Sequence, residues 1–246
     1  MLQLIGLLAV SWLLLRFLEK KDLAVLGLTP TLQRSKYFLW LLITSAVVSV
    51  SAYLLRMYFV KEVYVLAPSL TLKSVLQESW YQVRTVLTEE LLCRGALLYI
   101  LIRRIGRRNA VVVSSVLFAL LHWMNAGVFG NLIQMIVVFS FTFMMGLLLA
   151  YAYARTFSIL LPFAIHFGWN YVQNFVFPDS ASGQHLFMLA APPPEVTISY
   201  LAFYTMLLAP KLLVLVLNYL IVRQHPEMKT PQSKQNIFVQ FNRQQT

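Results

Sequence analysis

The chain has 246 residues, of which 59% are hydrophobic and only 12% are charged. Soluble domains average about 45–50% apolar and about 25% charged residues, so this composition indicates a membrane protein and excludes an ordinary soluble domain. The formal net charge is +11, but the basic residues gather in short segments between apolar runs. That distribution follows the positive-inside rule and argues against nucleic acid as a partner.

A membrane-spanning helix needs roughly 20 mostly apolar residues. Seven stretches fit this description, namely 2–18, 37–60, 84–102, 110–124, 131–154, 157–177 and 197–222. The first has the length of a signal peptide but lacks a basic leading segment and a small-residue cleavage site, which indicates a retained span. We therefore predict an all-α fold, a polytopic bundle of about seven transmembrane helices, with six to eight compatible with the sequence.

The remaining segments divide the chain into parts. Residues 62–83 mix polar and apolar side chains, which predicts a loop and then an amphipathic lead-in to the third span. Pro210 is expected to kink or divide the last span, because proline lacks the amide hydrogen that a helix uses. We expect four regions: N-terminal spans with the lead-in (1–79), a core (80–177), a loop with the last span (178–222) and a polar tail (223–246).

Lys and Arg alternate between the segments that join the spans. Thirteen lie in one set of segments, namely 19–36, 103–109, 155–156 and 223–246. Only Lys61 and Lys73 lie in the other set, namely 61–83, 125–130 and 178–196. The asymmetry predicts a multi-pass membrane protein with a cytoplasmic C-terminus. Short loops and the lack of a soluble domain favour a bacterial cell membrane.

Six polar residues lie in or beside the apolar stretches: Glu89, Glu90, Arg94, His122, His166 and Asn170. Ionisable side chains are costly in a bilayer, and where they occur they usually mark a functional cavity. These six residues are therefore the candidate site.

The candidate residues share one depth. Glu89 lies 14 residues from Arg103, and His122 lies 14 residues from Arg108. His166 lies 11 residues from Arg155. At a rise of about 1.5 Å per residue, all three lie roughly 16–21 Å from the basic segments. Three separate helices thus bring polar groups to one layer of the membrane, which indicates one shared site.

Helical spacing suggests how the side chains are grouped. Glu90 and Arg94 are four residues apart, so they share a helix face and can form an ion pair. Glu89 projects about 100° away from that pair and is left free. His166 and Asn170 are also four residues apart and can point into the same cavity.

A carboxylate beside two imidazoles has two established uses. It can act as a general base for water, while histidine and asparagine donate hydrogen bonds to a developing oxyanion. Glu89, His122 and His166 could instead bind zinc and leave one position open for water. The spacing alone does not separate these mechanisms. The single cysteine, Cys93, excludes a metal site built from several cysteines.

Three short sequences, EELLCR at 89–94, FALLH at 118–122 and HFGWN at 166–170, resemble the three motifs of the CAAX protease and bacteriocin-processing family, also called Abi. The resemblance covers about residues 80–175 and identifies the core region as the catalytic one. It implies an intramembrane endopeptidase that hydrolyses a peptide bond in a membrane-associated peptide or protein. It gives no oligomeric state.

The resemblance also implies roles for the residues. Glu89 would activate the hydrolytic water with help from His122, while His166 and Asn170 would stabilise the oxyanion. The neighbouring ion pair would hold the site together, and its carboxylate could assist catalysis. A mechanism that needs no cofactor is favoured over a zinc-dependent one.

Two other functions are compatible with parts of the pattern. A non-proteolytic bacteriocin-immunity or scaffold protein of the same fold could bind a peptide in this cavity. A transporter could use Glu89 and the histidines as a proton relay, but the sequence shows no internal repeat and no pair of broken helices. Other intramembrane proteases fit less well, since the chain contains neither His-Glu-x-x-His nor Gly-x-Gly-Asp.

Overall fold

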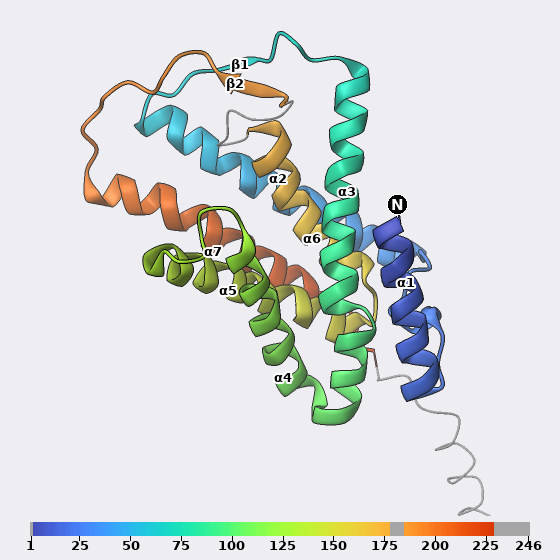
Figure 1. Cartoon of the computed structure of the whole chain (residues 1–246). Coiled ribbons are helices and arrows are strands. Elements are labelled where there is room, and N and C mark those ends of the chain that lie inside the picture. The colour runs from blue at the N-terminus through green and yellow to red at the C-terminus, as the bar shows by residue number, and fades with distance from the viewer. Residues whose placement is uncertain (1, 178–184, 229–246) are drawn as a thin grey trace, which may run out of the picture.

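The computed structural model describes residues 2–177 and 185–228. This part of the chain is mostly helical and has almost no strands, which confirms the predicted all-α fold. Its helices are α1 (Leu2–Leu14), α2 (Leu32–Phe59), α3 (Leu72–Arg94), α4 (Ala96–Leu121), α5 (Leu132–Thr156), α6 (Leu160–Tyr171) and α7 (Tyr200–Gln224) (Figure 1). Its strands, β1 (Tyr64–Leu66) and β2 (Phe187–Leu189), form one short antiparallel pair.

Four of the described helices are long and apolar enough to cross a membrane. They are α1 together with the π-helical turn that follows it (Leu15–Glu19), α2, α5 and α7. The protein is therefore an integral membrane protein, while the predicted count of seven spans is not confirmed. The predicted polar tail lies outside the described residues from position 229 onward.

The predicted third span, 84–102, is not one helix. α3 begins at Leu72, because Thr71 and Ser74 form a capping box in which each side chain bonds the other residue's backbone amide. The predicted amphipathic lead-in is therefore continuous with α3. The helix ends at Gly95, where a Cβ atom would lie 2.1 Å from the Leu91 carbonyl oxygen. Glycine is required at this position, and the chain turns there into α4.

Gly106 and Pro210 are two further residues that can interrupt a helix, and they differ in their effect here. Gly106 interrupts α4 with φ 78° and ψ 163°, a conformation that glycine adopts easily, so the basic segment 103–109 forms a bend. Pro210 lies inside α7, which runs on to Gln224. The helix is therefore not divided at the proline.

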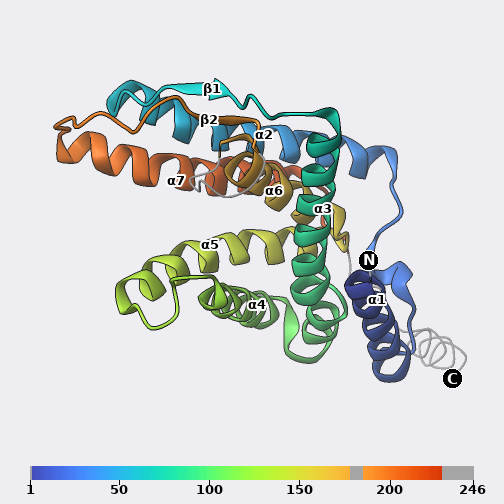
Figure 2. The same cartoon turned by 45° about the horizontal axis from the view of Figure 1, so that its top comes forward.

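Small residues allow the helices around the site to approach closely. α2 packs on α6 and α7, and α4 packs on α5 (Figure 2). At Gly168 of α6, a Cβ atom would lie 2.6 Å from the Leu42 carbonyl oxygen of α2. At Gly146 of α5, it would lie 3.0 Å from Cα of Ser115 in α4. Close backbone approach through small residues is the usual basis of helix association in membranes.

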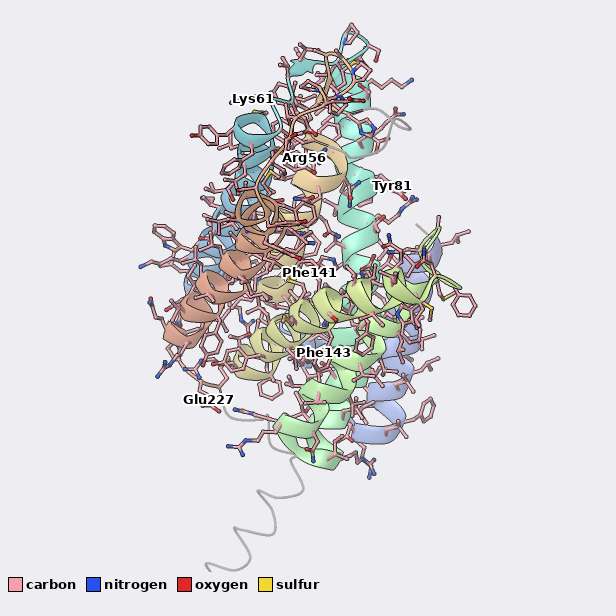
Figure 3. The ribbon with its side chains drawn as sticks, turned by 90° about the vertical axis from the view of Figure 1, so that its left-hand side faces the viewer. Arg56, Lys61, Tyr81, Phe141, Phe143 and Glu227 are labelled. Carbon is pink, nitrogen blue, oxygen red and sulfur yellow. The ribbon has the colours of Figure 1, made fainter. Side chains whose placement is uncertain are left out.

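The basic segments meet at one end of the molecule. Arg103 and Arg104 both pair with Glu19, each at 3.4 Å. Arg155 donates hydrogen bonds to the carbonyl oxygens of Arg223 and His225, each at 2.9 Å. Glu227 marks this end in Figure 3, while Arg56 and Lys61 lie at the opposite end, where β1 and β2 pair (Figures 1 and 3). The four segments predicted to share a membrane face thus lie together at one end of the molecule. The last of them is described as far as residue 228.

The contact at Gly168 yields a test of the packing. Gly168→Ala should force α2 and α6 apart and destabilise the protein by roughly 1–3 kcal/mol, as is usual when a tight core is overpacked. Gly6→Ala is the control, because no atom lies within 4 Å of its added Cβ. Thermal unfolding of the detergent-solubilised variants measures the difference. Equal midpoints for the two variants would contradict the packing described here.

Candidate active site

Glu90 is the centre of the polar cluster. Its side chain is fully buried, and Oε1 accepts a hydrogen bond from Arg94, which is also fully buried, at 3.1 Å. The same oxygen lies 2.7 Å from Nδ1 of His166. One carboxylate oxygen of α3 thus binds a cation on its own helix and an imidazole on α6.

The contact with Glu90 orients His166. A carboxylate can only accept, so Nδ1 of His166 carries the hydrogen, and Nε2 keeps its lone pair when the ring is neutral. Asn170 lies one turn further along α6, and its Nδ2 donates to Nε2 of His166 at 3.0 Å. The imidazole is therefore held from both sides.

His122 has the same tautomer as His166, and a different hydrogen bond sets it. It caps α4, and its Nδ1 lies 2.8 Å from the carbonyl oxygen of Phe118. Because a carbonyl oxygen can only accept, Nδ1 donates this bond and Nε2 again keeps a lone pair. The Phe118 ring packs against both imidazoles, with centroid distances of 4.5 Å to His122 and 5.6 Å to His166. The Arg94 guanidinium lies over the same ring at 4.0 Å, a favourable cation–π contact.

Glu89 faces the Nε2 atoms of both imidazoles. Its Oε2 lies 3.7 Å from Nε2 of His166 and 4.0 Å from Nε2 of His122. This oxygen is buried and makes no hydrogen bond with the described residues. The side chain as a whole is 31% exposed, whereas that of Glu90 is fully buried. The two adjacent carboxylates therefore occupy different environments.

The structure brings all six candidate residues together. The ion pair of Glu90 with Arg94 and the separate position of Glu89 agree with the helical spacing. The bond between Glu90 and His166 was not predicted, since nothing in the sequence relates two residues 76 positions apart. The contact of Phe118 with His122 does have a sequence signal, because the two are four residues apart on one helix.

The donor set does not fit a metal ion well. Zinc needs a free lone pair from each imidazole, but Asn170 already donates to Nε2 of His166. Among residues 2–177 and 185–228, no group of three or more His, Cys, Asp or Glu side chains has the arrangement of a metal site. The contacts around Glu89 thus favour a site that works through hydrogen bonds.

Comparison with known proteins identifies the core. Residues 71–172, which include all six candidate residues, match the family described as type II CAAX prenyl endopeptidase Rce1-like. The match confirms the resemblance predicted from the three motifs, and the family is one of proteases that act on membrane-associated proteins. Searches of curated proteins and of solved structures gave no match.

The contacts of Glu90 with Arg94 and His166 predict that removing Arg94 alone destabilises the protein more than removing the charges of both Arg94 and Glu90. Arg94→Met leaves a buried carboxylate without its cation and should destabilise the protein by about 3–5 kcal/mol. Adding Glu90→Gln should restore part of this loss, because the amide oxygen still accepts from His166 but carries no charge. Arg84→Met on the same helix is the control. Thermal unfolding of the four proteins measures the effect, and a double variant less stable than Arg94→Met would refute it.

Proposed function

On the family match of residues 71–172, we propose that the protein is an intramembrane endopeptidase that hydrolyses a peptide bond in a membrane-associated protein or peptide. Glu89 activates the attacking water, and the groups around His166 stabilise the intermediate. The proposal includes no metal, in keeping with the hydrogen bond that Asn170 makes to His166.

One observation carries the proposal: two hydrogen-bond acceptors face one point. They are Oε2 of Glu89 and Nε2 of His122, whereas Nε2 of His166 already accepts a hydrogen bond from Asn170. A water with two hydrogen bonds of about 2.8 Å holds acceptors roughly 4–4.5 Å apart, which agrees with the 4.0 Å between these two atoms. Such a water donates both hydrogens to the protein and keeps a lone pair for attack on a carbonyl carbon.

Glu89 is the base in this arrangement. Oε1 of Glu90 is bonded to Arg94 and His166 and the whole side chain is buried, while Glu89 is 31% exposed and its Oε2 has no hydrogen-bond partner among the described residues. When the water attacks, its proton passes to Glu89. General-base catalysis of this kind contributes typically 10²–10⁴-fold to a rate.

Asn170 supplies the donor for the oxyanion, and His166 positions it. One N–H of the Asn170 amide bonds to His166, which leaves its second N–H for the substrate oxygen. The contact of His166 with the buried Glu90 carboxylate at 2.7 Å holds the imidazole, and through it the amide, in place. The proton that Glu89 took from the water then passes to the leaving amine.

An apolar groove beside the site suits a substrate that comes from the bilayer. It has a volume of about 320 Å³ and lies between the end of α3 and the second half of α4, with Leu92, Leu117 and Leu121 in its walls. Leu92 lies one turn after Glu89, and Leu121 immediately precedes His122. A membrane-embedded peptide can place an apolar side chain there. We also propose that the basic end, which includes the end of α7, faces the cytoplasm.

The proposal predicts that Glu89 is needed for activity but not for folding. Membranes containing Glu89→Gln protein should lack peptides that the wild-type protein releases, because an amide cannot accept the proton from water. Glu195→Gln is the control, since Glu195 is exposed and far along the chain from the core. Comparative peptidomics of the three membranes, with protein levels and thermal midpoints matched, measures the effect.

Identical peptide profiles for wild-type and Glu89→Gln membranes would contradict proteolysis. If Glu89→Gln protein also kept its cellular effect, a non-proteolytic immunity or scaffold role would replace the enzyme. A loss of peptides that came only with a loss of folded protein would show that Glu89 has a structural role.

A further inference from the structure

A polar strip runs along α3 from its first turns to the base. Glu78, Gln82, Thr85 and Glu89 are spaced four, three and four residues apart, so they share one face of the helix. At about 1.5 Å per residue, the strip is roughly 16 Å long. It starts near the end of the molecule that carries β1 and β2 and ends at the active site (Figure 1).

A second polar strip on α6 lies beside it. His166, Asn170 and Asn174 follow one another at four-residue intervals, through α6 and the π-helical turn after it. α3 and α6 lie side by side in both views (Figures 1 and 2). Asn174 donates to Gln82 across the two helices at 3.4 Å. These two strips form what we call the α3–α6 seam.

Further polar contacts extend the seam away from the active site. The hydroxyl oxygens of Ser79 and Tyr171 lie 2.8 Å apart. Gln82 is only 4% exposed, while Glu78, Thr85 and Glu89 are half-buried along one margin. The opposite side of α3 packs on α1, where Leu91 joins Leu4 and Leu15 in an apolar cluster. The polar side of α3 is thus distinct and continuous.

Hydrogen bonds between α3 and α6 explain why some, but not all, of the residues in the seam are polar. Ser79, Gln82, Tyr171 and Asn174 bond to one another, as polar residues in membrane helices often do. Glu78 forms no ion pair with a described residue, and an unpaired carboxylate away from water is strongly unfavourable. The margin of the seam at Glu78 therefore needs water, and Thr85 continues the polar surface from there to Glu89.

We propose that the α3–α6 seam is a hydrated path that brings water to Glu89 from the end of the molecule that carries β1 and β2. The proposal rests on the function proposed above, in which Glu89 consumes one water for each bond hydrolysed. It assigns Gln82 and Thr85 as residues that keep the path polar. The apolar groove lies beyond Glu89 on the same helix, at Leu92. Water and apolar substrate then approach the base from opposite directions.

Cysteine accessibility tests the path without any measurement of activity. Wild-type protein is the blank, because its one cysteine, Cys93, is 1% exposed. Thr85→Cys and Gln82→Cys place thiols in the seam. Trp80→Cys is the control, because Trp80 is 49% exposed but projects from another face of α3. Full-length protein in vesicles of known orientation is treated with a membrane-impermeant, charged thiol reagent from each side.

The path predicts that Thr85→Cys reacts at least tenfold faster than Trp80→Cys when the reagent is on the β1–β2 side, and that Gln82→Cys also reacts faster than the control. Equal rates, or faster reaction from the basic side, would overturn it. Fast labelling of a protein that releases no peptides would refute the peptidase but keep the path. Slow labelling of an active peptidase would refute the path alone.

Discussion

The structure of the site depends on one buried carboxylate. Oε1 of Glu90 binds Arg94 at 3.1 Å and His166 at 2.7 Å, with both acidic and basic side chains fully removed from solvent. A buried charge is tolerated only when it is paired and hydrogen-bonded, so these partners are needed for folding as much as for function. Oε1 of Glu90 is thus bonded twice, while its neighbour Glu89 makes no hydrogen bond through Oε2 with the described residues and faces two imidazole nitrogens.

The surroundings of Glu89 are apolar on one side and polar on the other. On one side of it, the apolar groove is lined by exposed leucines such as Leu92 and Leu121. On the other side, the seam at Gln82 and Thr85 offers a polar surface that membrane lipids cannot solvate. A hydrolase inside a bilayer must bring together an apolar substrate and water, and the stretches of α3 before and after Glu89 suit these opposite requirements.

The sequence predicted the parts of the site that depend on one helix at a time. Glu90 with Arg94 follows from four-residue spacing, and the common layer follows from counting residues to the basic segments. The bond from Glu90 to His166 depends on how α3 packs against α6, which spacing within a single helix does not encode. The boundaries of α3 were also missed, because the predicted span was defined by hydropathy. The helix is instead set by the Thr71 capping box at one end and by Gly95 at the other.

The central claim is that Glu90 fixes the hydrogen of His166 on Nδ1, so that Nε2 accepts the hydrogen bond from Asn170 beside Glu89. Nitrogen-15 NMR of protein labelled in its four histidines measures this directly, with His122→Gln and His166→Gln for assignment. The account predicts that His166 carries its proton on Nδ1 in the resting protein, with Nε2 unprotonated, and that His122 does the same. A proton on Nε2 of His166 would contradict it, because Nε2 could then not accept the hydrogen bond from Asn170.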